Sequence, residues 1–211
     1  MSIIVEELKA GRDFDASRAT EAEVASLGAR MFARLREEAA TALAAPLTAP
    51  LQELVATSTD LATLVARRLS ECLAQGADPA LAAAVTAAVN DYLRTSAGLR
   101  ALVGDLLFAL RVDPAVLLLA QPALLFKGTF AVCAHRVAHG LWKSGGLASA
   151  LWLQARAAEL WGADIHPAAT LGCGVMLDHG EHRTCTAVWR GSRPMSTEFT
   201  RLRGCAQAQA W

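Results

Sequence analysis

Apolar side chains recur at helical spacing from about residue 22 to residue 161. Thr20 and Glu23 have the spacing of a capping box. The apolar residues that follow fall on one face of a helix (Val24, Leu27, Met31, Leu35). The pattern returns over residues 61–73 and stops before Gly76, a residue suited to the left-handed backbone after a helix. The first half of the chain is therefore predicted to be α-helical.

The next segments also carry residues typical of the starts and ends of helices. Asp-Pro pairs at 78–79 and 113–114 predict two helix starts, because Asp caps free N–H groups and Pro fits the first helical turn. Three further helices are predicted over residues 97–111, 122–143 and 147–161. Gly145 and Gly146 separate the last two, and Gly162 ends the series. Residues 1–161 are predicted to form an all-α domain.

The period changes at Gly162. Ile165, Leu171 and Leu177 are six residues apart, with Gly172 and Gly174 between them. A six-residue period is typical of a left-handed parallel β-helix, in which each hexapeptide places one aliphatic side chain inside a triangular prism. Arg183 occupies the next slot, so the period covers about one coil. Residues 162–180 are therefore predicted to start a β-helix.

Residues 181–211 follow neither period and hold five Arg against two Glu. The segment is predicted to be an irregular tail. The fold class expected for the whole chain is α+β, with an all-α N-terminal domain, the first coil of a β-helix and this tail.

Composition narrows the class of protein. The chain has 211 residues, of which 54% are hydrophobic and 19% charged, as expected for a packed globular protein. Lys+Arg and Asp+Glu are both 20, so no net charge attracts nucleic acid. No apolar stretch approaches the length of a membrane span. Five cysteines without a C-x-x-C pair, and no recognisable signal peptide, favour a cytoplasmic protein.

The densest polar cluster lies in residues 164–180. Asp164 and His179 are fifteen residues apart, and one β-helix coil is about eighteen, so both could lie near one edge. A carboxylate that orients a histidine produces a general base able to deprotonate a hydroxyl. Solvent-exposed turn residues of a solenoid would give the same pattern, and spacing alone favours neither interpretation.

Other residues carry weaker signals. His135 and His139 are four apart on a predicted helix but lack a third ligand, so packing or capping is preferred to a metal site. Cys173 between two glycines is interpreted as a turn residue, not as a nucleophile. Asp113 is interpreted first as a helix N-cap. No metal site or tightly bound cofactor is predicted.

Two segments resemble bacterial serine O-acetyltransferase, a hexapeptide-repeat acyltransferase of cysteine biosynthesis. The motifs are Arg-x-Asp-Pro-Ala-Val at 111–116, Lys-Gly at 127–128 followed by Arg136, His139 and Trp142, and Asp-Ile-His-Pro to Met-Leu-Asp-His at 164–179. The resemblance covers residues 100–180 and, by helical character, extends back to residue 20. It implies a helical N-terminal domain, a left-handed β-helix and trimers that pair through the helical domains.

The resemblance also implies roles for four residues. His179 corresponds to the general base that takes the proton from the serine hydroxyl during attack on acetyl-CoA, and Asp164 to the carboxylate that orients it. Asp113 and Asp178 correspond to residues that hold L-serine. Acetyl-CoA is then a co-substrate, and the residues that bind it are not identified.

The resemblance ends at Gly180. The later coils, the CoA groove and the C-terminal tail that docks the partner sulfhydrylase are not recognisable in residues 181–211. A one-base shift in one coding sequence for Glu181–Cys185 gives Ser-Thr-Gly-Leu-Val, close to the family's continuation, which suggests an out-of-frame tail. We therefore expect little or no acetyl transfer by the chain as printed. The alternative function is a non-catalytic, helical oligomerisation module.

Overall fold

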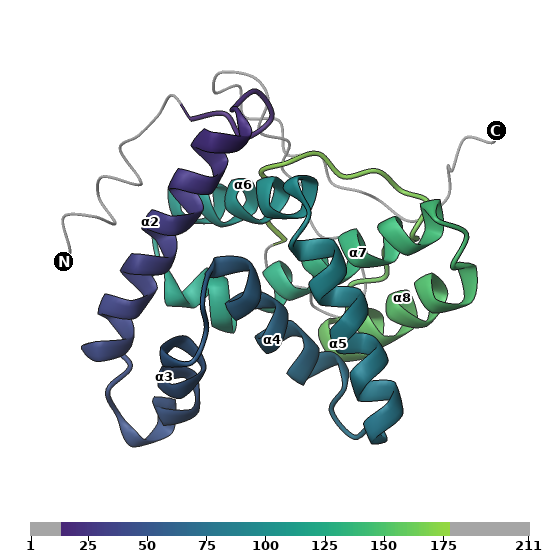
Figure 1. Ribbon diagram of the computed structural model, residues 1–211, viewed down its shortest axis with the longest axis horizontal. Coiled ribbons are helices and arrows are strands. Elements are labelled where there is room, and N and C mark those ends of the chain that lie inside the picture. The colour runs from purple at the N-terminus through teal and green to yellow at the C-terminus, as the bar shows by residue number, and fades with distance from the viewer. Residues whose placement is uncertain (1–13, 178–211) are drawn as a thin grey trace.

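The computed structural model describes residues 14–177, which are predominantly helical (Figure 1). In chain order the elements are α2 (Glu21–Ala40), η1 (Pro46–Thr48), α3 (Ala49–Ala56), α4 (Leu61–Leu73), α5 (Pro79–Leu93), α6 (Ser96–Val112), η2 (Gln121–Leu125), α7 (Lys127–Lys143) and α8 (Leu147–Trp161). η1 is a 3₁₀-helix and η2 a turn of π-helix. Strand structure within residues 14–177 is limited to one isolated bridge at Leu177.

Side-chain caps fix the starts of several helices, and the sequence predicts two of them, at Thr20 and Asp78. Thr20 and Glu23 form a complete capping box at α2. Asp78 accepts hydrogen bonds from two backbone N–H groups at the start of α5. Asp60 and Thr95 cap α4 and α6 in the same manner. These caps satisfy N–H groups that have no partner inside the helix, so each helix begins at a defined residue.

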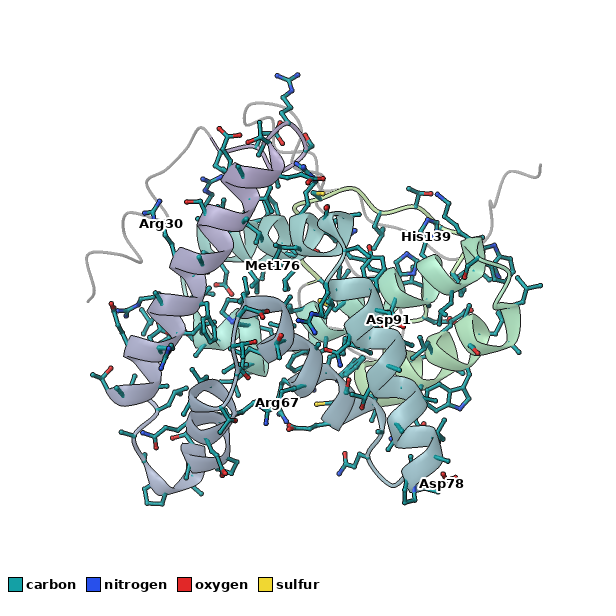
Figure 2. The ribbon with its side chains drawn as sticks, viewed as in Figure 1. Arg30, Arg67, Asp78, Asp91, His139 and Met176 are labelled. Carbon is teal, nitrogen blue, oxygen red and sulfur yellow. The ribbon has the colours of Figure 1, made fainter. Side chains whose placement is uncertain are left out.

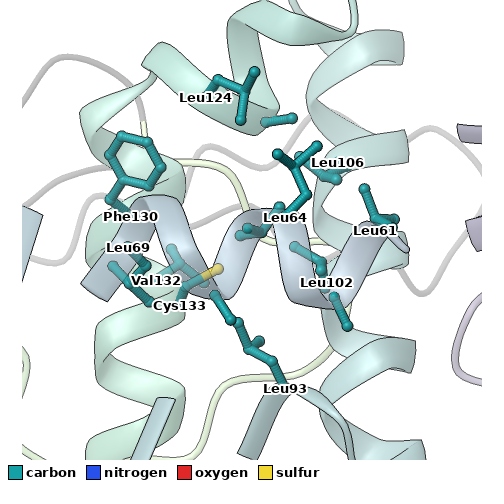
Figure 3. Packing of buried hydrophobic residues seen from close by; sticks show 14 of the residues in the cluster. Leu61, Leu64, Leu69, Leu93, Leu102, Leu106, Leu124, Phe130, Val132 and Cys133 are labelled. Atoms are coloured by element: carbon teal, nitrogen blue, oxygen red, sulfur yellow. The ribbon is translucent and has the colours of Figure 1, made fainter. Parts of the chain in front are cut away.

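The core lies where α4, α6 and α7 meet. Leu64 and Leu69 project from α4 toward leucines of α6 and toward Phe130 on α7 (Figure 3). α8 packs along α7, and α5 packs on both α4 and α7. The side chains labelled in Figure 3 are buried (Leu61, Leu64, Leu69, Leu93, Leu102, Leu106, Leu124, Phe130, Val132, Cys133). This packing makes α6 and α7 a fixed surface for the residues that follow α8.

Residues 113–126 depart from the sequence prediction. No helix starts at Pro114, and α7 begins at Lys127 instead of residue 122. Side chains take three N–H groups at its start: Asp113 accepts from Ala115, and Gln121 accepts from the N–H groups of residues 117 and 118. Because side-chain oxygens replace helical carbonyls as acceptors there, the chain forms turns before η2 begins at Gln121.

Gly162 adopts a left-handed conformation (φ 70°) and ends α8, as predicted. Residues 163–177, here called the strap, then run back across α7 to α6 (Figure 1). Leu177 is buried in the helical core, and Ile165 and Leu171 pack against this core. The first residues of the six-residue period therefore contact the helices. Residues 162–177 of the predicted first coil contain no strand apart from the bridge at Leu177, so the structure does not show the β-helix. The last three residues of that coil and the tail lie outside the described residues.

Within residues 14–177, no helix is both long enough and apolar enough to cross a membrane.

Candidate functional site

Three side chains of α7 hold the strap by its backbone carbonyls. His135 Nε2 lies 3.1 Å from the carbonyl oxygen of Ala169, and His139 Nδ1 lies 2.7 Å from that of Pro167. A carbonyl oxygen only accepts hydrogen bonds, so each of these ring nitrogens carries the proton. Figure 2 labels His139 on α7. These contacts give the two histidines a packing role, the docking of the strap, in line with the preferred interpretation of the sequence.

Arg136 is the third of these side chains and is paired with Asp105 of α6. Its Nε and Nη2 each lie 2.9 Å from a carboxylate oxygen of Asp105. The same guanidinium donates to the carbonyls of Leu171 (3.3 Å) and Gly172 (2.6 Å). Asp105 in turn accepts from the N–H of Val175 at 2.8 Å. Both charged side chains are buried, and their hydrogen bonds connect α6, α7 and the strap.

Burial disfavours the charged form of both side chains. It raises the pKa of the Asp105 carboxyl group against the effect of Arg136. It disfavours the charged form of Arg136, but Asp105 more than offsets this and raises the pKa of the guanidinium. Arginine stays protonated in proteins, and the carboxylate accepts three close donors, so the pair is ionised.

His135 is a buried, neutral imidazole. Burial lowers its pKa to about 4, although the carbonyls of Ala169 and Ile165 act in the opposite direction. The nearby His139 and Arg136 lower it further. At neutral pH the ring therefore carries one proton, on Nε2, and donates it to the strap.

This pKa makes stability depend on pH. The unfolded chain takes up a proton on His135 below its ordinary value of 6.5, whereas the folded chain does so only near 4. Stabilisation from the neutral ring is complete above about pH 6.5 and is lost as pH falls toward 4, by about 2 kcal/mol. His135→Gln keeps a donor for Ala169, so its free energy of unfolding should fall about 2 kcal/mol less between pH 7 and pH 4.5. Equal losses in urea titrations of the two proteins would contradict this.

Two glycines allow the strap to approach the helices closely. A Cβ atom at Gly128 of α7 would lie 2.0 Å from the carbonyl oxygen of Leu177. One at Gly104 of α6 would lie 2.8 Å from the Cβ of Ala16 and 3.3 Å from that of Cys173. The end of the strap therefore lies directly on the helix backbone.

Gly128→Ala should displace the end of the strap, because backbone atoms must move to admit the methyl group. We expect the free energy of unfolding to fall by about 1–3 kcal/mol. Gly28→Ala on α2 is the matched control, since its Cβ would meet only ordinary contacts at 3.5 Å or more. Helix propensity favours alanine there by up to about 1 kcal/mol. Equal effects of the two substitutions in thermal unfolding would refute this interpretation.

Asp164 lies at the start of the strap and is exposed. Its Oδ1 accepts a hydrogen bond of 2.6 Å from Gln154 Nε2 on α8. His166, two residues later, packs its ring edge-on against Trp142 with centroids 5.1 Å apart. Asp164 is thus oriented by a neighbouring helix and remains accessible to a second partner.

Asp113 is half-buried at the end of α6, in the turn segment that begins there. Glu38 of α2 anchors the other end of that segment. Its carboxylate is fully buried and accepts from the N–H groups of Leu119 (3.0 Å) and Ala120 (2.8 Å), while Arg34 Nε donates to it at 2.9 Å. The turn that presents Asp113 is therefore held at both ends.

Asp178 and His179 lie outside the described residues. The structure therefore places two of the four predicted site residues, Asp113 and Asp164. Cys173 is half-buried, and burial raises the pKa of its thiol, which suits a packing residue better than a nucleophile. Residues 14–177 contain no group of three or more His, Cys, Asp or Glu side chains placed to hold a metal ion.

Sequence reasoning gave no role to four residues that build this region: Glu38, Asp105, Arg136 and Gln154. Asp105 carries a usable signal, because it is a carboxylate within the broad apolar face of residues 97–111. A charge in such a face is expected to have a buried partner. The partner itself, 31 residues away, cannot be identified from spacing.

A cavity of about 350 Å³ lies between α2, α4 and the start of α6. Gly28, Phe32, Leu61 and Leu99 line it, with Arg94 among its few polar residues. None of the predicted site residues lines this cavity.

Comparison with known proteins identifies the helical part. The family model for the N-terminal region of serine acetyltransferase matches residues 31–134. A probable serine acetyltransferase 4 of Oryza sativa subsp. japonica is 49% identical over 75 residues, which are 36% of this chain and 24% of the rice protein.

Solved structures give longer matches. Neisseria gonorrhoeae serine acetyltransferase in complex with serine superposes with a TM-score of 0.65 and 35% identity, over 71% of this chain and 62% of that one. The Brucella abortus enzyme in complex with coenzyme A gives a TM-score of 0.63 and 29% identity, over 68% and 58%. The matched segment thus spans about a quarter of the rice relative and less than two thirds of the solved chains. These matches show that the helical part of this chain is similar to the N-terminal region of serine acetyltransferases.

Proposed function

We propose that this chain is a serine O-acetyltransferase by lineage, an acyltransferase that moves the acetyl group of acetyl-CoA to the hydroxyl of L-serine in cytoplasmic cysteine biosynthesis. The observation that carries the proposal is the strap, which fixes an accessible Asp164 beside Gln154 and leads toward His179. The solved relatives in complex with serine and with coenzyme A support the choice of substrates.

In this mechanism His179 accepts the proton of the serine hydroxyl as the oxygen attacks the thioester carbonyl. Asp164 orients the imidazole and stabilises its protonated form. Collapse of the tetrahedral adduct forms O-acetylserine and releases the CoA thiolate, which takes up a proton. Direct transfer within a ternary complex relies on proximity and a general base and forms no acyl-enzyme.

Asp113 and Asp178 bind the serine substrate in this proposal. A carboxylate suits the ammonium group of an amino acid, and Asp113 is held in place through its own hydrogen bond to Ala115 and through the Glu38 anchor. The residues that follow the strap continue as a left-handed β-helix in the proposed fold and supply the CoA groove.

The test is serine-dependent release of CoA thiol. We expect the chain as printed to show little or none, because residues 181–211 carry no recognisable hexapeptide period. A chimaeric protein that joins residues 1–180 to the remainder of the Neisseria gonorrhoeae enzyme should restore transfer, with Asp113→Asn raising the KM for serine. Failure of a folded, CoA-binding chimaera to acetylate serine would reject the proposal.

A second candidate, the helical oligomerisation module, is favoured by exposed apolar side chains. Leu47 is 97% exposed, and Leu147 and Leu151 on α8 are 50% and 44% exposed. Neighbouring exposed apolar side chains mark surfaces that pair, and Leu147 and Leu151, four residues apart, share one face of α8. We expect the printed chain to self-associate at micromolar concentration, as dimers. Light scattering that gives a monomer mass across this range would contradict this prediction.

A further inference from the structure

The Asp105–Arg136 pair holds more than the two helices that carry it. Of its five hydrogen bonds, two join the carboxylate to the guanidinium and three reach backbone groups of the strap. The three strap groups are the carbonyls of residues 171 and 172 and the N–H of Val175. The pair therefore contacts three residues within the five-residue stretch 171–175 of the strap.

We propose that Asp105 and Arg136 are positioning residues for the site described above: they fix the strap backbone and so set the direction in which the chain leaves the helical domain toward Asp178 and His179. This inference rests on the proposed function for its catalytic meaning. The placement of the strap itself does not depend on that function.

Energetics supports a role beyond joining α6 to α7. A buried ion pair contributes little more to stability than well-packed apolar residues of similar volume, and often less. A buried backbone N–H group without a partner, however, is costly. The pair supplies a partner for the buried N–H of Val175 and for the part-buried carbonyls of residues 171 and 172, which apolar side chains cannot do.

Chain length makes the anchor relevant to the base. His179 follows Val175 by four residues, and an extended chain spans at most about 3.6 Å per residue. The Cα atom of His179 therefore lies within about 14 Å of the anchored Val175. At the other end, His139 and Gln154 hold the strap near Asp164. Asp164 is thus tied to fixed helices, and only three residues separate the proposed base from the anchored Val175.

The thiol of Cys173 reports whether the strap is docked. Cys173 lies inside the anchored segment and is half-buried, with its Cβ facing Gly104. Two other cysteines serve as internal references in the same molecule. Cys72 on α4 is also half-buried, and Cys133 on α7 is fully buried. Alkylation rates of the three thiols, mapped by mass spectrometry, separate local release of the strap from global unfolding.

The first variant is D105L/R136M in the full 211-residue chain. Its apolar side chains replace the ion pair, so the helices should remain packed. We expect Cys173 to be alkylated about ten-fold faster or more, with Cys72 and Cys133 unchanged within about two-fold. Unchanged alkylation of Cys173 in the folded variant would overturn the proposal.

The second variant, Arg136→Lys, decides the matter if the first does not fold. Lysine keeps the positive charge but lacks the planar fork that reaches Asp105 and two carbonyls together. Cys173 should again react faster while Cys133 stays protected. Equal reactivity of Cys173 in Arg136→Lys and the parent chain would refute the role of Arg136. Neither variant needs enzymatic activity, so failure here is distinct from failure of the acetyltransferase proposal.

Discussion

Replacing His179 by alanine in the chimaeric enzyme should lower kcat by about 10²–10⁴-fold, because the serine hydroxyl then loses its general base. Helix content should not change, since residue 179 lies outside the helical domain. The measurement is serine-dependent thiol release at saturating acetyl-CoA, with circular dichroism on the same samples.

His166→Ala is the matched control for that substitution. His166 is an exposed histidine of the strap, and its ring packs against Trp142. We expect its kcat to stay within about three-fold of the parent value, since no proton transfer depends on it. Near-normal activity of His179→Ala would remove His179 from the catalytic role.

Arg136→Ala should have the largest effect on stability. It leaves the Asp105 carboxylate buried without its cation and removes both donors to the strap carbonyls. Removing one partner of a buried ion pair costs about 3–5 kcal/mol. Urea unfolding of the 211-residue chain measures the change in the free energy of unfolding.

The double variant D105L/R136M is the comparison for this loss. It removes both charges, so no uncompensated charge remains, and its helical domain should retain most of the parent stability. If Arg136→Ala lowers the free energy of unfolding no more than the double variant does, the unpaired charge of Asp105 is not the cause of the destabilisation.

The helices could be predicted from the sequence because local signals determine them. The apolar period of α2 and α4 and the caps Thr20 and Asp78 agree with each other, and the structure confirms them. α8 ends at Gly162 for the same reason. Where helix propensity, apolar period and capping all favour one conformation, tertiary contacts stabilise that same conformation.

Residues 113–126 could not be predicted in the same way. Asp113 and Pro114 have the local signature of a helix start, yet the N–H groups of Leu119 and Ala120 bind Glu38, about 81 residues earlier in the chain. No local pattern carries that contact. In this segment the tertiary hydrogen bonds outweigh the local helix propensity.

The candidate site was only partly accessible from sequence. Spacing pointed to Asp164, resemblance to a family pointed to Asp113 and Asp164, and the structure adds the surroundings that hold them. Spacing could not pair Asp105 with Arg136, or Arg136 with carbonyls 35 and 36 residues further on. Every residue has a backbone carbonyl, so the residue type does not show which carbonyl is bound. Such contacts are seen only in the structure.

The long sequence separation between Asp105 and the strap has a consequence for synthesis on the ribosome. α6 and α7 are complete once residue 143 has emerged. Val175, the strap partner of Asp105, is made 70 residues after Asp105. At about 5–20 residues per second, the helices wait seconds for the strap, with the polar groups of Asp105 and Arg136 open to water. Hydration of these two charges keeps water on the surface of α6 and α7 that the strap later covers. This disfavours binding of apolar segments of other nascent chains to that surface.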